Sequence, residues 1–288
     1  LGLYTSAIFC DPGKYTGPEL VLAILVFAYQ LYADFGGCCD IAIGAARMLG
    51  FDFMENFNRP FAAKNFQALW QRWHISLTSF FRDYVFTPLV WSRWTEKLPI
   101  IGKKISKPPA VSSVIIIFAL SGLWHGPHIN YVVWGLLNGG IMAIATLFSK
   151  RWDKMIRKIP VYGTTPIRGF CQRIIVYLMF SGCLVFFASA MFKFPVADWL
   201  AGLASGWRGA FVNGTLVTNL LATGLTTNLL LALGGGILLV ESVEQFGNVA
   251  DWIRRRLWVW RWPLYYLLLA GLLFFGAFGQ SPFIYQQY

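Results

Sequence analysis

Long apolar stretches separated by short polar ones dominate this chain of 288 residues. The first runs from Pro18 to Leu49 and is compatible with a helix that Gly36-Gly37 interrupts. A second, Val111–Phe148, contains Gly126-Pro127, where proline removes a backbone donor and disfavours helix in the residue before it. Three further stretches are candidate spans: Ile174–Phe192, Leu216–Val240 and Pro263–Phe278. The pattern predicts an all-α bundle of transmembrane helices.

The segment Phe51–Trp94 has a different pattern, since it is amphipathic and rich in aromatic and arginine residues. Trp and Tyr mixed with Arg are typical of helices that lie at the membrane interface or re-enter the membrane. We therefore predict one membrane-embedded domain over residues 1–288, with an amphipathic or re-entrant segment at 51–94 and a hairpin at 111–148.

His125 marks the bend of that predicted hairpin. Val111 to Trp124 would give about 21 Å of helix at ~1.5 Å per residue, which is shorter than the ~30 Å hydrocarbon core. Basic residues flank the stretch on both sides, at Lys103, Lys104, Lys107, Lys150, Arg151 and Lys154. Because positive charge favours cytoplasmic loops, both ends of the hairpin should face the cytoplasm. His125 would then lie within the membrane, where irregular backbone must be buried or line a wet cavity.

Composition supports a membrane protein. The chain is 57% hydrophobic and 13% charged, against about 25% charged in a soluble domain. Its net charge of +11 is spread over loops beside apolar stretches, which disfavours nucleic-acid binding. The five cysteines form no C-x-x-C pair and predict neither a disulfide framework nor a metal site. The chain begins with Leu1, so we expect an amino-terminal part to be missing.

The candidate chemistry centres on histidine. An ionisable side chain at membrane depth is costly and indicates function, and imidazole exchanges protons near neutral pH. His125 could act as a general base on an acceptor hydroxyl, typically worth ~10²–10⁴-fold in rate. The sequence lacks G-x-S-x-G and G-x-x-x-x-G-K-[ST]. His74 would line the same cavity or be a hydrogen-bonded interfacial residue, and His128 fits a plain turn.

Other polar and aromatic residues are candidates for lining the same cavity: Asp40, Arg72, Trp73, Ser76, Arg82, Asp83, Trp124 and Asn138. Two of these carry structural alternatives. Asp40 could instead cap a turn after Gly36-Gly37, and Arg82-Asp83 could form a structural ion pair. We predict no metal and no bound cofactor.

Several motifs occur in order along the chain. They are Asp34-Phe35-Gly36-Gly37-Cys38-Cys39-Asp40, Glu55-Asn56-Phe57-Asn58-Arg59-Pro60, Trp70-Gln71-Arg72-Trp73-His74-Ile75-Ser76-Leu77, Phe81-Arg82-Asp83-Tyr84-Val85, Gly122-Leu123-Trp124-His125-Gly126 and the closing Ser281-Pro282-Phe283-Ile284-Tyr285-Gln286-Gln287-Tyr288. In this order the chain resembles the membrane-bound O-acyltransferase family, in particular its bacterial branch that acetylates alginate and cell-wall polysaccharides.

The resemblance implies an essential histidine at His125 and a second, frequently important one at His74. It implies a multi-pass protein of the bacterial cytoplasmic membrane with a tunnel through the bilayer. The acyl group would come from a cytoplasmic donor, acetyl-CoA, and pass to an acceptor through an extracytoplasmic partner protein. Members of this branch are longer, which implies further amino-terminal helices.

The chain departs from the family pattern at Cys38-Cys39 and at Val90-Trp91-Ser92-Arg93, which weakens alginate as the acceptor. Phe86-Thr87-Pro88-Leu89 resembles the acetyltransferases. O-acetylation of an extracytoplasmic polysaccharide is thus the leading hypothesis. The alternatives are D-alanyl transfer from a carrier protein to teichoic acid and, as a non-enzyme, a proton-linked transporter.

Overall fold

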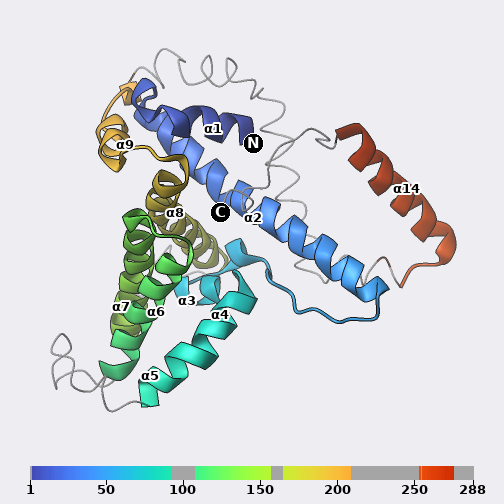
Figure 1. Ribbon diagram of the computed structural model, residues 1–288, viewed down its shortest axis with the longest axis horizontal. Coiled ribbons are helices and arrows are strands. Elements are labelled where there is room, and N and C mark those ends of the chain that lie inside the picture. Colours follow the sequence, from blue (N-terminus) through green and yellow to red (C-terminus); the bar gives the residue numbers. More distant parts are fainter. Residues whose placement is uncertain (1, 92–107, 157–164, 209–252, 254, 276–288) are drawn as a thin grey trace. The chain divides into compact units, whose positions relative to one another are not determined.

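The computed structural model describes residues 2–91, 108–156, 165–208, 253 and 255–275 (Figure 1). These residues form helices and no strand, which confirms the predicted all-α class. The chain divides into two compact units, residues 1–224 and 225–288. The first contains the candidate site. The second contains α14, Trp258–Phe275, which coincides with most of the predicted stretch Pro263–Phe278.

The first unit begins with α1, Gly2–Cys10, the short helix η1, Pro12–Lys14, and α2, Gly17–Met48. The start of α2 is fixed because the backbone N–H and the hydroxyl of Thr16 both donate to Glu19 Oε2, over 2.7 and 2.9 Å. A carboxylate at this end of a helix also satisfies the partial positive charge of the free N–H groups.

The predicted break at Gly36-Gly37 is wrong, because α2 continues through both glycines. Each glycine costs roughly 1 kcal/mol in a helix interior, but an interrupted helix in lipid would leave several backbone groups without hydrogen bonds. Gly36 is also buried, and a side chain there would contact Tyr32 and Phe57. Asp40 therefore caps no turn and lies on the exposed surface of α2.

Residues 51–91 form several short helices and no helix long enough to span a membrane. They are η2 (Pro60–Ala62), α3 (Phe66–Trp70), α4 (Ile75–Phe81), the π-helix η3 (Arg82–Phe86) and α5 (Thr87–Trp91). The last three follow one another directly, and Figure 1 shows α4 and α5 in line. Two residues with positive φ, Arg59 and His74, precede η2 and α4 and set the direction of the chain there.

Helices α6, Pro108–Trp124, and α7, Ile129–Ile156, form an antiparallel pair that lies side by side in Figure 1. The chain reverses over residues 125–128, where Gly126 has a φ of 144°. The two helices approach so closely that a Cβ on Gly135 would overlap the backbone of Phe118. Small residues permit this approach, a common device in membrane helix pairs.

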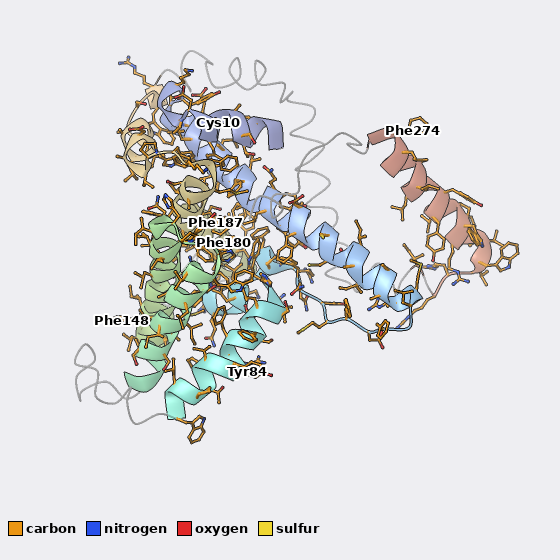
Figure 2. All side chains as sticks on the ribbon, in the orientation of Figure 1. Cys10, Tyr84, Phe148, Phe180, Phe187 and Phe274 are labelled. Carbon is orange, nitrogen blue, oxygen red and sulfur yellow. The ribbon has the colours of Figure 1, made fainter. Side chains whose placement is uncertain are left out.

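Helix α8, Thr165–Phe192, packs against both α2 and α7, and α9, Val196–Leu203, follows it. Tyr177 Oη donates to the backbone carbonyl of Leu25 over 2.6 Å and so joins α8 to α2. Phe180 and Phe187 of α8 are buried and lie centrally in Figure 2, whereas Tyr84 and Phe148 are exposed. Helix α8 is therefore the central element of this unit.

Three described helices are long and apolar enough to cross a membrane: Gly17–Met48, Ile129–Phe148 and Arg168–Phe192. The apolar part of α6, Val111–Trp124, is shorter, in line with the length argument from the sequence. The predicted stretch Leu216–Val240 lies outside the described residues.

Candidate active site

His125 is the first residue after α6 and is 9% exposed. Its ring is surrounded by aromatic rings from three elements. The ring centroids of Trp124, Trp134, Phe187 and Tyr131 lie 4.9, 5.2, 5.1 and 6.1 Å from that of His125. The imidazole that directly follows α6 is therefore enclosed by aromatic rings of α7 and α8.

His74 lies at the turn between α3 and α4, with φ 45° and ψ 57°. Few side chains other than glycine adopt this left-handed conformation, although His is among those that tolerate it. Its ring lies edge-on to Phe35 of α2, with a centroid distance of 4.7 Å. The turn thus directs the imidazole back toward α2.

Trp124 contacts both histidines. Its ring centroid lies 6.2 Å from that of His74 and 4.9 Å from that of His125. Both imidazoles therefore contact the same indole ring, although they are 51 positions apart in the sequence. Trp124 itself is 56% exposed, so this pair of histidines lies near an accessible surface of the described structure.

Ser76 and Asn56 adjoin His74. Ser76 Oγ lies 3.5 Å from His74 Nδ1 and donates to Asn56 Oδ1 over 2.6 Å. The backbone of the Asn56–Asn58 segment is held against the same turn, because Ile75 N–H donates to the Asn56 carbonyl and Asn58 N–H to that of Arg72. The loop after α2 thereby fixes the turn that carries His74.

Of the remaining candidates, Trp73 and Asn138 are buried next to this region. Trp73 packs on Phe180, with ring centroids 4.9 Å apart. Asn138 is fully buried on α7 and its Nδ2 donates to the carbonyl of Trp134 over 2.7 Å. Asn138 lies one helical turn after Trp134, whose ring contacts that of His125, so it adjoins the site through Trp134.

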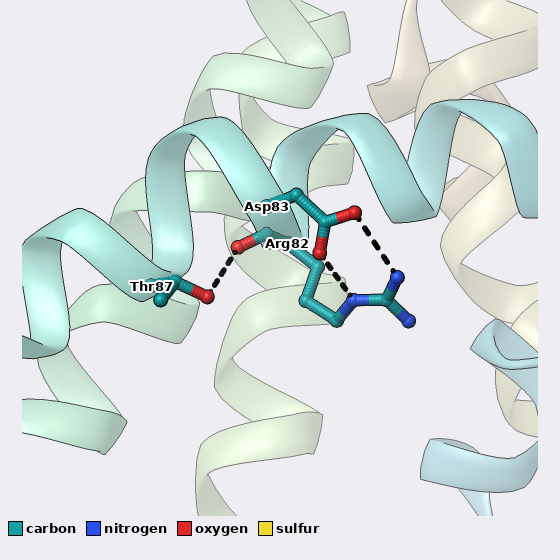
Figure 3. A network of polar contacts seen from close by, with 3 residues as sticks. All are labelled: Arg82, Asp83 and Thr87. Atoms are coloured by element: carbon teal, nitrogen blue, oxygen red, sulfur yellow. Dashed lines mark hydrogen bonds and ion pairs between the residues drawn. The ribbon is translucent and has the colours of Figure 1, made fainter.

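Arg82 and Asp83 lie elsewhere, on the exposed π-helix η3 (Figure 3). Two contacts of 2.7 and 3.2 Å join the guanidinium to the carboxylate, which lowers the pKa of Asp83 through a hydrogen bond from Arg82. Thr87 Oγ1 donates to the Arg82 carbonyl over 2.9 Å and closes the wide turn. The ion pair foreseen as the structural alternative is present, and neither residue contacts the histidines in the described structure.

Arg72 also has a local contact, because its Nη1 lies 3.4 Å from the Asn58 carbonyl. His128 is exposed, and its Nδ1 accepts from Asn130 N–H over 3.2 Å, as expected of a turn residue. Within the described residues, no group of three or more His, Cys, Asp or Glu side chains could hold a metal ion.

Sequence reasoning missed Asn56 and the rings of Phe35 and Phe187 as parts of this region. Asn56 belongs to the motif at residues 55–60 that resembles the family. Its hydrogen bond with Ser76 joins residues 20 positions apart, and no periodic pattern in the sequence indicates such a bond. Phe187 looked like any other apolar residue of a predicted span. Only the packing of α8 against the turn after α6 identifies it.

Comparisons with known proteins show the family to which the chain belongs. The family model described as MBOAT, membrane-bound O-acyltransferase family, matches residues 19–191, which include both histidines. A probable alginate O-acetylase of Pseudomonas aeruginosa is 38% identical over 123 residues, covering 43% of this chain and 22% of that protein.

Two further relatives have different names. A peptidoglycan O-acetyltransferase of Helicobacter pylori is 34% identical over 136 residues, covering 47% of this chain and 24% of that protein. A teichoic acid D-alanyltransferase of Bacillus subtilis is 36% identical over 148 residues, covering 50% of this chain and 36% of that protein. The matched segments thus span about a quarter to a third of these relatives.

Proposed function

Because the chain belongs to the membrane-bound O-acyltransferase family, we propose that it transfers an acetyl group from a cytoplasmic donor to a hydroxyl group of an extracytoplasmic polysaccharide. Two named relatives support the acetyl group, since one is called an alginate O-acetylase and the other a peptidoglycan O-acetyltransferase. The polysaccharide differs between these names, so we propose only that an acetyl group is transferred and that the final acceptor is a polysaccharide.

One observation carries the proposal: His74 and His125 both pack against the ring of Trp124. An ionisable side chain is costly to bury in a membrane protein, so a buried histidine indicates a function. Two histidines beside one indole ring are suited to proton transfer. Neither is held in a metal cluster of the described residues. A general base acting directly on a bound hydroxyl is the chemistry that this pair supports best.

In the proposed reaction, His125 accepts the proton of the acceptor hydroxyl while the oxygen attacks the thioester carbonyl of the donor. A carbon–oxygen bond forms, the carbon–sulfur bond breaks, and the proton passes from the imidazole to the departing sulfur. The products are an ester and a thiol, so no oxidant or reductant is required. His74 would orient the acceptor or stabilise charge beside the reacting carbonyl.

The proposed donor is acetyl-CoA and the location is the cytoplasmic membrane of a bacterium. The hydroxyl that reacts at His125 would belong to an extracytoplasmic partner protein, which then passes the acetyl group to the polysaccharide. A passage from one side of the bilayer to the histidines is part of this proposal. The two imidazoles near an accessible surface support it, because both substrates must approach the same group.

D-alanyl transfer to teichoic acid is the second candidate. The relative with that name matches 50% of this chain, more than the 43% and 47% of the two acetyl-transferring relatives. The chemistry at His125 would be the same, with a D-alanyl thioester on a carrier protein as donor. Labelled donors of the two kinds, offered to the same purified protein, would distinguish the candidates.

The main test compares His125→Ala with His128→Ala in the whole protein, expressed in cells that lack the natural gene. We expect His125→Ala to reduce surface O-acetylation by about 10²–10⁴-fold, the usual contribution of a general base. His128→Ala is the matched control, since His128 lies in the same turn but is exposed. The measurements are ester-linked acetate on the cell surface and the amount of protein in the membrane.

Normal acetylation by His125→Ala at normal protein level would overturn the proposal. Loss of acetylation in both variants would indicate that the turn, rather than the imidazole, is what matters.

A further inference from the structure

The hydrogen bonds around Asn56 determine which nitrogen of His74 carries the proton. Three groups take part: the Asn56 amide, the Ser76 backbone and hydroxyl, and the His74 ring. They come from the loop after α2 and from the start of α4. Some of these atoms can only donate a hydrogen bond and others can only accept one.

The orientation of the Asn56 amide is fixed first. The Ser76 backbone N–H lies 3.1 Å from one terminal atom of the amide and can only donate, so that atom is the oxygen, Oδ1. The other terminal atom, Nδ2, then faces Cys39 Sγ over 3.4 Å, where it donates to sulfur. Cys39, which departs from the family pattern, thereby supplies an acceptor that is consistent with this orientation.

The Ser76 hydroxyl is fixed next. Its oxygen lies 2.6 Å from Asn56 Oδ1, and a carbonyl oxygen can only accept, so the single hydroxyl proton points to Asn56. Lone pairs of Ser76 Oγ therefore remain for the other neighbour, His74 Nδ1, at 3.5 Å. An unprotonated Nδ1 would place two lone pairs against each other, whereas a protonated Nδ1 faces an acceptor.

We propose that Asn56 is a positioning residue which, through Ser76, holds neutral His74 with its proton on Nδ1 and leaves the lone pair on Nε2. The inference deepens the proposed function and rests on it for its catalytic meaning. In that reaction, Nε2 of His74 accepts a hydrogen bond from another O–H or N–H group of the acceptor and so orients it, while His125 removes the proton of the reacting hydroxyl. A second-layer group that selects a tautomer in this way is common around histidines.

The direct test is nitrogen NMR of the whole protein in lipid nanodiscs, with ¹⁵N in the histidine rings. At a pH well above the ordinary imidazole pKa of ~6.5, we expect His74 to show a protonated Nδ1 and an unprotonated Nε2. The protein has three histidines, so variants lacking each one assign the signals. A His74 ring protonated on Nε2 would overturn the proposal.

Three variants test the link. Asn56→Ala frees the Ser76 hydroxyl to donate to His74, and Ser76→Ala removes it, so both should shift His74 toward Nε2 protonation. Ser76→Thr retains the hydroxyl and should preserve the Nδ1 proton. Asn65→Ala is the matched control, because Asn65 also caps a short helix, accepting from Ala68 N–H over 2.7 Å, without a contact to His74. An unchanged tautomer in Asn56→Ala would overturn the link.

Activity gives the second measurement. Acetyl transfer should fall about 10- to 100-fold in Asn56→Ala and in Ser76→Ala, the range for second-layer partners of a functional histidine. The double variant should lose no more than either single variant, because both act through one contact, and Ser76→Thr should retain the rate.

The two arms separate the two proposals. An Nδ1 proton that depends on Asn56, in a protein without acyl transfer, would contradict the proposed function alone. Transfer that is lost with His125 but unaffected by Asn56→Ala would contradict the positioning role alone.

Discussion

His74 occupies a backbone conformation that few residues other than glycine adopt. Its φ of 45° places it in the left-handed region, which costs an ordinary residue roughly 1–2 kcal/mol. A hydrogen bond from another segment holds the backbone in this conformation, since the Asn56 carbonyl accepts from the N–H of the next residue, Ile75. Strain that surrounding structure maintains in this way often accompanies function. The turn and the imidazole can therefore be tested separately.

We predict that His74→Asn and His74→Ala differ in stability but agree in activity. Asn tolerates the left-handed region, so His74→Asn should unfold close to the wild type, whereas His74→Ala should lose about 1 kcal/mol. Both lack the ring and should transfer less acetate. Thermal unfolding in detergent and the transfer rate measure the two effects. A fully active His74→Asn would reduce His74 to a structural residue.

The helical hairpin of α6 and α7 depends on close backbone contact. A Cβ on Gly135 would come within 2.9 Å of the Phe118 carbonyl carbon, and closer still to its oxygen. Backbone atoms inside a helix cannot move aside as a flexible side chain can. Any larger residue at this position therefore separates α6 from α7 and displaces the turn with His125.

We predict that Gly135→Val destabilises the protein by about 1–3 kcal/mol, the usual cost of overpacking. Gly140→Val is the matched control, because it lies on the same helix and a Cβ there meets no atom within 4 Å. Chemical unfolding in mixed micelles measures the difference. Equal stability of the two variants would show that α6 and α7 are not in direct contact at Gly135.

Within residues 1–224, polar contacts join elements that are distant in sequence. Tyr177 Oη reaches the Leu25 carbonyl across 152 positions, and Asn130 Nδ2 donates to Ser189 Oγ over 2.9 Å. In an apolar environment such bonds compete with little water, although measured contributions in membrane proteins average only ~0.6 kcal/mol. They fix the register of helices whose apolar surfaces alone would allow sliding.

We therefore predict a small loss of stability, about 0.5–1.5 kcal/mol, for Tyr177→Phe, which removes only the hydroxyl that joins α8 to α2. Tyr84→Phe should have no effect, because Tyr84 is 72% exposed. The measurement is the midpoint of thermal unfolding, with secondary structure as the probe. A midpoint for Tyr177→Phe equal to that of Tyr84→Phe would contradict the role assigned to this bond.

The amino-acid sequence alone indicated the long apolar helices and the bend that follows α6 at His125. Apolar length and the Gly126-Pro127 pair are local properties, and backbone groups in lipid must bond within their own helix, so the composition of a segment nearly fixes its structure. The same reasoning failed at Gly36-Gly37, where local propensity predicted a break. The demand for continuous backbone bonding and the packing of Tyr32 and Phe57 outweighed the intrinsic cost of glycine.

The packing of the helices selected which polar residues lie together in one site. It brought His74 to His125 across Trp124, attached Asn56 to the turn of His74, and left Arg82-Asp83 as an exposed ion pair. All of these residues lie in motifs of similar appearance. Contacts between distant segments depend on how whole helices pack, and packing has no period or spacing that one segment of sequence can show.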